Sequence, residues 1–156
     1  MYQVTREIPF CYGHRLLNYQ GKCKNLHGHN GTAVITLCAP ELDSSGMVLD
    51  FSEIKKLVSA WIDETLDHRM LLCKDDPLLP FLRQMGEPIC VMDGNPTAEN
   101  IARYIFEFVL SRGFPVTQVT LWETESCCAT YAPTPAAEPG RDETRRKAVA
   151  ARPGIF

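Results

Sequence analysis

Two histidines stand one residue apart in the stretch "GKCKNLHGHNG", which covers residues 21–31. The chain has only four histidines, so His27 and His29 are half of all its imidazoles. Residues i and i+2 of a β-strand point to the same face, so this spacing would present the two rings side by side. Two adjacent imidazoles are typical of a divalent-metal site.

His14 is the third candidate ligand. It follows the expected first strand, and it can complete the set if the first two strands pair as neighbours. A catalytic zinc ion usually has three protein ligands and keeps a fourth position for water or substrate. An isolated H-x-H is more often a pair of ordinary surface or core histidines, but a third nearby histidine favours a metal. Three imidazoles would also bind divalent ions other than zinc.

Three further residues have side chains suited to proton transfer. Cys23 lies four positions before His27. Free cysteines are mostly small buried hydrophobes, yet a thiol near a divalent cation gains thiolate character and can act as a base. Asp67 and His68 end an expected helix, where a histidine often matches the helix dipole. Alternatively, His68 is the one imidazole left for proton transfer when the other three bind metal.

Glu123 lies in the middle of "VTLWETES". Its carboxylate either faces solvent, which is the common case, or faces a pocket and accepts N–H groups from a guanidine-like edge of a heterocycle. Thr97 and Glu99, in "NPTAEN", are either residues that begin a helix or residues that line the same pocket.

The residues that must position these groups form strands at both ends of the chain. Residues 2–10 and 31–39 are rich in alternating or β-branched apolar residues, which predicts two strands. "FPVTQVTLWETES" and "CCATYAP" predict a closing pair of strands.

Two helices are expected between the strand pairs. Residues 50–68 have apolar residues on one helical face, and Asp50 with Glu53 forms a candidate capping box. A second helix is expected to begin with Asn95 as its N-cap and Pro96 in its first turn. The connection between the helices holds one short strand at most.

The element order is therefore β-β-α-α-β-β, an α+β fold with a four-stranded antiparallel sheet and both helices on one face. Two open sheet edges favour an oligomer. Residues 1–132 are expected to form one domain. Residues 133–156 contain four prolines and few large apolar groups, so we expect a flexible or peripherally docked tail.

Composition excludes several classes of function. The net charge is −3 and no basic stripe is present, which disfavours nucleic-acid binding. No apolar run approaches the roughly 18 residues that a membrane span requires. The seven cysteines are odd in number and include no C-x-x-C, which indicates thiols in a reducing cytosol and hence a cytoplasmic protein.

Six fragments, taken in order, resemble one family. They are "FCYGHRL", "CKNLHGH", "GMVLDFSEIK", "LDHRML", "NPTAEN" and "LWETES". Each fragment alone is weak evidence for a family, but the six fragments in this order are specific evidence, and they span residues 1 to about 132. The chain resembles the 6-pyruvoyltetrahydropterin synthase and 6-carboxytetrahydropterin synthase family.

The resemblance implies the tunnelling fold, in which subunits join into a trimeric β-barrel, stack as hexamers and form their sites between subunits. It implies zinc bound by the three histidines, a catalytic cysteine, an Asp–His pair, a pterin-anchoring glutamate and two residues of the pterin pocket. By this resemblance His14, His27 and His29 are the zinc ligands, Cys23 is the catalytic cysteine, and Asp67 and His68 are the Asp–His pair. Glu123 is the pterin-anchoring glutamate, and Thr97 and Glu99 are the two residues of the pterin pocket.

The implied substrate is 7,8-dihydroneopterin triphosphate, a small molecule. In the family branch that forms the biopterin precursor, the 6-pyruvoyl synthases, five residues usually separate the cysteine from "HGH". Here only Lys24, Asn25 and Leu26 intervene, as in the 6-carboxytetrahydropterin branch. That branch releases acetaldehyde and supplies the precursor of queuosine and related deazapurines, so we favour it over the 6-pyruvoyl chemistry.

Two alternatives remain open: a non-catalytic, zinc-stabilised binding oligomer, and a cyclohydrolase on the same fold. Tyr12 departs from the family, which often has a small residue at this position, and "WETESCC" differs from the usual sequence of either branch. Lys22, Lys24 and Arg69 are candidates for the triphosphate.

Overall fold

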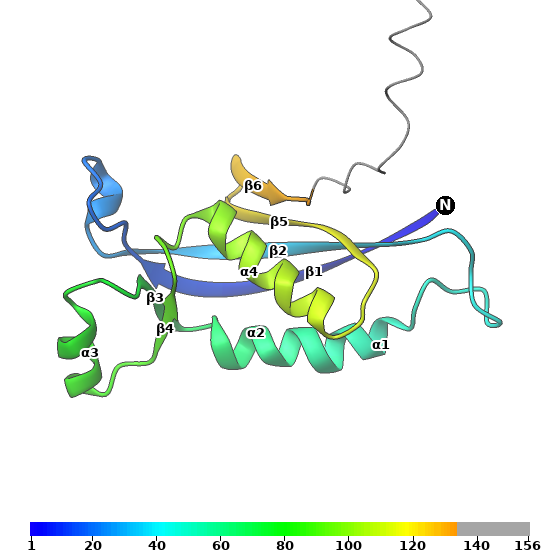
Figure 1. Cartoon of the computed structure of the whole chain (residues 1–156), viewed down its shortest axis with the longest axis horizontal. Coiled ribbons are helices and arrows are strands. Elements are labelled where there is room, and N and C mark those ends of the chain that lie inside the picture. Colours follow the sequence, from blue (N-terminus) through cyan, green and yellow to red (C-terminus); the bar gives the residue numbers. More distant parts are fainter. Residues whose placement is uncertain (134–156) are drawn as a thin grey trace, which may run out of the picture.

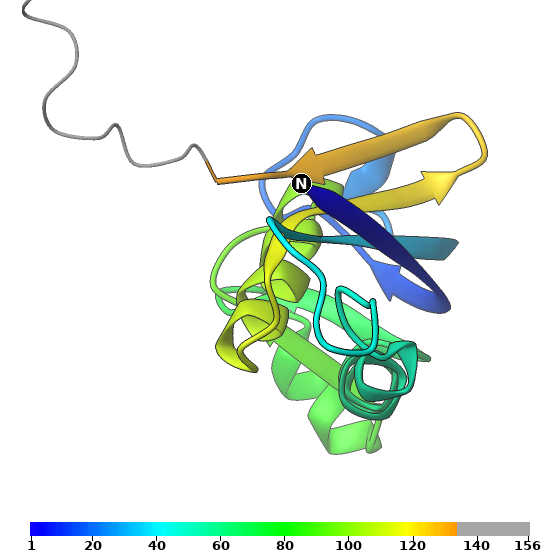
Figure 2. The same ribbon diagram turned by 90° about the vertical axis from the view of Figure 1, so that its right-hand side faces the viewer.

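The computed structural model describes residues 1–133, and residues 134–156 lie outside the described part. The described part is built on one six-stranded sheet with the order β4-β3-β1-β2-β5-β6. The helices α1, α2 and α4 cover one side of this sheet (Figures 1 and 2). Apart from Pro133, the segment expected to form a tail lies outside the described residues.

The centre of the sheet is a long antiparallel hairpin of β1 (Tyr2–His14) and β2 (His27–Ala39). Its register places His14 opposite His27. The strand β1 was expected to end at residue 10, before His14. It continues because Tyr12 and His14 keep the alternation of buried side chains that begins with Ile8 and Phe10.

The remaining strands extend the hairpin on both sides. On one side, β5 (Val116–Thr124) pairs antiparallel with β2, and β6 (Cys127–Tyr131) pairs antiparallel with β5. On the other side, β3 (Arg69–Cys73) pairs with β1 and β4 (Ile89–Met92) pairs with β3, both in parallel.

The prediction of a four-stranded, purely antiparallel sheet was therefore wrong. The chain between the two long helical segments contains β3, β4 and the helix α3 (Leu79–Met85). Strands β3 and β4 are short, and their sequences "RMLLC" and "ICVM" lack a clear polar–apolar alternation. Short apolar runs of this kind are typical of buried parallel strands, which periodicity alone does not reveal.

The first helical segment runs from α1 (Phe51–Ile54) through one π-helical stretch, η2 (Lys55–Ser59), into α2 (Ala60–Thr65). Asp50 caps it by accepting the Ser52 N–H at 2.7 Å.

The second helix, α4 (Ala98–Ser111), begins later than expected. Its N-cap is Thr97 and not Asn95, because the Asn95 side chain bonds to the backbone of Leu17 instead. At the other end, Gly113 at φ +81° follows the Arg112 C-cap.

The core lies between the sheet and the helices. Full burial of each large aliphatic side chain contributes about 1.5–3 kcal/mol. The same face of β1 that packs on this core carries Tyr12 and His14 at its end, so the core leads directly into the histidines. The largest fully buried core residues include Ile35, Leu37, Ile54, Ile62, Leu66, Ile101, Ile105 and Leu121.

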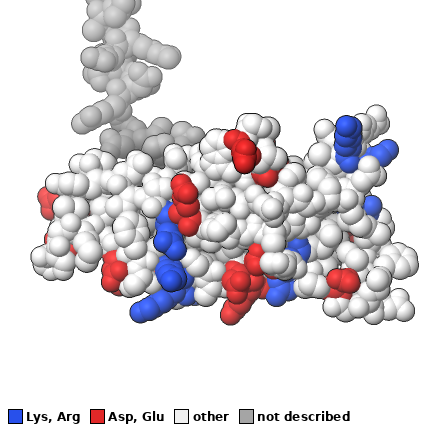
Figure 3. Space-filling view, turned by 180° about the vertical axis from the view of Figure 1, so that it is seen from behind, with Lys and Arg blue, Asp and Glu red and all other residues white. Residues whose placement is uncertain are grey.

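Within residues 1–133, no helix has the length and apolar character needed to cross a membrane. Figure 3 shows basic and acidic side chains interspersed on one face of the molecule, with large uncharged areas between them.

Candidate active site

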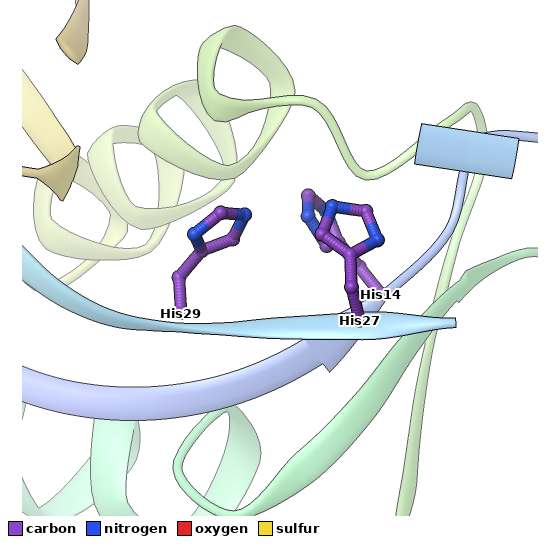
Figure 4. Close-up of side chains that lie close together, drawn as sticks. All are labelled: His14, His27 and His29. Carbon is purple, nitrogen blue, oxygen red and sulfur yellow. The ribbon is translucent and has the colours of Figure 1, made fainter. Parts of the chain in front are cut away.

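His14, His27 and His29 converge where β1 ends and β2 begins. The ring centroids of His14 and His27 are 4.4 Å apart, and that of His29 lies 5.1 Å from the first and 5.2 Å from the second. One nitrogen from each ring can be chosen so that all three lie within 4.8 Å of one another. Figure 4 shows the three imidazoles on the same side of the sheet. This arrangement suits a divalent metal.

Hydrogen bonds to backbone carbonyls orient two of these rings. Nδ1 of His14 donates to the Pro96 carbonyl at 2.7 Å, and Nδ1 of His27 donates to the Asn25 carbonyl at 2.8 Å. A proton on Nδ1 leaves the lone pair on Nε2, which is the form in which a histidine binds metal.

His14 gives the clearest sign that a ligand belongs here. Its Nε2 is buried and has no hydrogen-bond partner among residues 1–133. A buried polar atom without a partner costs free energy, and a metal ion would remove that cost. Burial lowers the pKa of His14, and the adjacent His27 lowers it further, which keeps the ring neutral and able to bind a cation.

The loop before α4 holds the Pro96 carbonyl in place. The Asn95 side chain accepts the Leu17 N–H at 2.7 Å and donates to the Leu17 carbonyl at 2.9 Å. Asn100 in turn donates to the Asn95 carbonyl at 2.8 Å. The "NPTAEN" segment therefore ties the loop after β1 to α4 and orients His14.

Glu123 on β5 faces the histidines. Its Oε1 lies 4.0 Å from His14 Nε2 and accepts the Tyr12 hydroxyl at 2.9 Å. Burial and the Glu123 carboxylate raise the pKa of Tyr12, so this hydroxyl stays protonated and remains a donor. Tyr12 stood out in the sequence only as a departure from the family, and its bond to Glu123 was not foreseen.

Cys23 lies in the short 3₁₀ turn η1 (Lys22–Lys24) between β1 and β2. Its carbonyl accepts the Leu16 N–H at 2.8 Å, which folds the turn back toward the end of β1. Its thiol is half-buried. In the described part of the chain, Cys23 belongs neither to the histidine cluster nor to the group around His68.

Asp67 and His68 form a close pair after α2. Asp67 Oδ2 accepts from His68 Nδ1 at 2.6 Å, and Asp67 Oδ1 accepts the Cys11 N–H at 2.8 Å. Burial opposes ionisation of Asp67, but the bonds from Cys11 and His68 outweigh it and hold its pKa below the usual range. His68 has a φ of +53°, and its N–H donates to the Cys11 carbonyl at 2.7 Å. The backbone of Cys11 thus clamps both members of the pair, which the sequence did not indicate.

The other candidate residues lie on three different elements, η1, β3 and the start of α4. The Thr97 hydroxyl accepts the Asn100 N–H at 3.4 Å, and Glu99 is exposed in the first turn of α4. Lys22 and Lys24 are exposed in η1. Arg69 lines a cavity of about 430 Å³ together with Cys11 and His68.

Comparisons with known proteins agree with this arrangement. The family model described as 6-pyruvoyl tetrahydropterin synthase matches residues 3–134. A 6-carboxy-5,6,7,8-tetrahydropterin synthase from Rickettsia conorii is 40% identical, over 81% of this chain and 97% of the relative. A 6-pyruvoyl tetrahydrobiopterin synthase from Pongo abelii is 32% identical, over 83% of this chain and 90% of the relative. The solved structure of Caenorhabditis elegans 6-pyruvoyl tetrahydropterin synthase is 29% identical, with a TM-score of 0.65 over 85% of this chain and 96% of that one. With a match that covers nearly all of its described residues, the chain belongs to the 6-pyruvoyl tetrahydropterin synthase family.

Proposed function

We propose that this chain is a zinc-dependent lyase of the 6-carboxytetrahydropterin synthase type. It would convert 7,8-dihydroneopterin triphosphate and water into 6-carboxy-5,6,7,8-tetrahydropterin, acetaldehyde and triphosphate. The observation that carries the proposal is the convergence of His14, His27 and His29 beside Glu123, with the Nε2 atom of His14 buried and without a hydrogen-bond partner in the described part of the chain.

The three histidines would hold the zinc ion through ring nitrogens. A zinc ion held there would supply Lewis acidity toward the side-chain hydroxyls of the substrate and would make the adjacent C–H bonds more acidic. Because His14 and His27 already donate from Nδ1 to carbonyls, the protein fixes their rings in advance.

Glu123 would bind the pterin ring. A carboxylate can accept two parallel N–H bonds from the guanidine-like edge of a pterin. Tyr12 donates to Oε1 of Glu123 and so restricts the rotation of the carboxylate. Thr97 and Glu99, at the start of α4, would line the same pocket.

Cys23 and the Asp67–His68 pair would move the protons. Cys23 would take a proton from the substrate as a thiolate, and His68, oriented by Asp67, would pass protons on. The two groups lie in separate places within one chain, so we propose that they meet across a subunit interface. The edge strands β4 and β6 leave the sheet open at both ends, which suits closure into a trimeric barrel and stacking into a hexamer.

The 6-carboxy chemistry is favoured over the 6-pyruvoyl chemistry by the short spacing between Cys23 and His27 and by the higher identity to the relative with the 6-carboxy name. A non-catalytic zinc-stabilised oligomer would explain the histidines, but it has no need for Cys23, the ordered Asp67–His68 pair and Glu123.

The test is anaerobic incubation of the zinc-loaded protein with 7,8-dihydroneopterin triphosphate, followed by mass spectrometry of the products. We expect 6-carboxytetrahydropterin and acetaldehyde in equal amounts. A 6-pyruvoyl product would assign the chain to the other chemistry, and unchanged substrate with full zinc would refute the proposed reaction.

A further inference from the structure

The side chain of Asn95 joins two loops whose bonded residues are 78 positions apart in the chain. Its amide oxygen accepts the Leu17 N–H at 2.7 Å, and its amide nitrogen donates to the Leu17 carbonyl at 2.9 Å. A planar carboxamide offers an acceptor and a donor side by side, whereas a carboxylate offers acceptors only. An aspartate of the same shape could therefore form only one of these two bonds.

The backbone of Asn95 is bonded to the start of α4. Its carbonyl accepts the Thr97 N–H at 2.8 Å and the side-chain amide of Asn100 at 2.8 Å. Thr97 is the N-cap of α4, and Asn100 lies in its first turn. Asn95 thus has hydrogen-bond partners in two separate parts of the fold, the loop after β1 and the beginning of α4.

Pro96 connects Asn95 to the three-histidine site. Its carbonyl accepts from Nδ1 of His14 at 2.7 Å, and both residues are buried. Because the proline ring fixes its own φ, the direction of this carbonyl depends mainly on where Asn95 and Thr97 lie. His14 is buried whereas His27 and His29 are half-buried, so the surrounding protein determines the position of His14 most closely.

The bonds from Asn95 also restrain the loop that carries Cys23. Leu16, the residue before Leu17, donates its N–H to the Cys23 carbonyl at 2.8 Å. A side chain that fixes Leu17 therefore restricts the turn η1 as well as the end of β1. Loss of the Asn95 amide would release both the support of His14 and the support of this turn.

We propose that Asn95 is a positioning residue that fixes the loop after β1 against α4 and thereby sets the affinity of the three histidines for zinc. The inference rests on the proposed function in one respect, that zinc is the ion which these histidines bind. Replacement of a residue that supports a metal ligand typically lowers metal affinity by about 10-fold to 100-fold. Asn95 acts through the Pro96 carbonyl, one step further from the ion, so we expect the lower end of this range.

Zinc affinity is measured first, because it does not depend on activity. The metal-free full-length protein competes for Zn²⁺ with a chromogenic chelator, at a temperature where circular dichroism shows every variant to be folded. Asn95→Ala should bind zinc about tenfold more weakly than the wild type. Asn95→Asp keeps the bond from the Leu17 N–H and loses the bond to the Leu17 carbonyl, so its affinity should lie between the two.

Two variants serve as controls for this affinity. Asn25→Ala is the matched substitution, because Asn25 is exposed and supports His27 through its backbone carbonyl. Val109→Ala removes a fully buried side chain near the other end of α4, so it lowers the stability of the fold at a distance from Asn95. Both controls should keep the wild-type affinity. Wild-type affinity in Asn95→Ala, or an equal loss of affinity in Val109→Ala, would overturn the inference.

Hydrogen exchange of the metal-free protein gives the second measurement. Peptides from residues 15–24 should exchange faster in Asn95→Ala than in the wild type, because the Leu17 N–H loses its acceptor. Equal exchange in the two proteins would refute the role of Asn95 in fixing this loop. Neither measurement involves turnover. A protein that shows both effects but leaves 7,8-dihydroneopterin triphosphate unchanged would therefore contradict the proposed reaction and support this inference.

Discussion

The Tyr12 hydroxyl donates to the Glu123 carboxylate at 2.9 Å, across two strands that are not neighbours in the sheet. Tyr12 lies on β1 and Glu123 on β5, with β2 between them. The bond joins the buried Tyr12 ring to the carboxylate that we propose as the pterin anchor. The contribution of this hydrogen bond to substrate binding can be measured.

Tyr12→Phe should weaken substrate binding. The change keeps the ring and removes the donor, so the Glu123 carboxylate loses a partner that fixes its orientation. A hydrogen bond to a charged group contributes about 1.5 kcal/mol or more, which predicts a rise in KM of roughly tenfold with a smaller change in kcat. Steady-state kinetics would measure it, with Tyr2→Phe, an exposed tyrosine of the same strand, as control. An unchanged KM would show that Tyr12 does not position the carboxylate.

His27→Ala should remove the metal from the three-histidine site and abolish turnover, because two imidazoles hold zinc far less tightly than three. The fold should persist, since His27 is only half-buried at the end of its strand. Metal analysis and circular dichroism would test both points. Asn25→Ala is the matched control: Asn25 supports His27 through its backbone carbonyl, so this variant should keep its metal. A fully metal-loaded three-histidine site in His27→Ala would exclude His27 as a ligand.

Cys23→Ala should keep the three-histidine metal and lose most turnover. Loss of a general base typically lowers the rate about 10²–10⁴-fold. The measurement is kcat at saturating substrate together with metal content, and Cys38→Ala, at the far end of β2, serves as the control thiol. Wild-type kcat in Cys23→Ala would remove Cys23 from the mechanism.

Asp76→Asn should destabilise the protein in a pH-dependent way. The Asp76 carboxylate is buried and accepts from Arg15 Nε at 2.8 Å and from the Leu78 N–H at 2.8 Å. The bond from Arg15 holds its pKa below the usual range. The stabilisation is therefore complete above the ordinary aspartate pKa of about 3.9 and is lost as the pH falls through the lower, folded-state value.

Urea unfolding at fixed protein concentration should show Asp76→Asn less stable by about 3 kcal/mol at pH 7, with the gap closing below about pH 4. Asp93→Asn is the control, because the Asp93 side chain is 99% exposed and its pair with Lys74 contributes little. A gap that stays constant with pH would show that the charge of Asp76 is not what stabilises the fold.

The sequence alone predicted the features that depend on local periodicity. Strands β1, β2, β5 and β6, the two long helical segments and the paired orientation of His27 and His29 follow from periods of two and 3.6 residues. The connection between the helices was expected to hold one short strand at most, but two strands, β3 and β4, form there. Short, buried parallel strands have no distinctive period, so the pattern did not reveal both.

Contacts between distant parts of the chain could not be predicted in this way. Cys11 and Asp67 are 56 positions apart, and Tyr12 and Glu123 are 111 apart. Such pairs meet only because the order of strands in the sheet brings them together, and that order was not predicted. The family resemblance named Asp67, His68 and Glu123, but it assigned no role to Cys11 or Tyr12.

The backbone of β1 holds the Asp67–His68 pair, so the position of the pair depends little on which side chain stands at residue 11. The clamp uses the N–H and C=O of residue 11, so many side chains at this position leave the pair in place. The contacts of the Cys11 sulphur with Asp67 and His68 are an addition to that clamp. Position 11 can therefore vary during evolution while the geometry of the proposed proton-transfer pair is inherited unchanged.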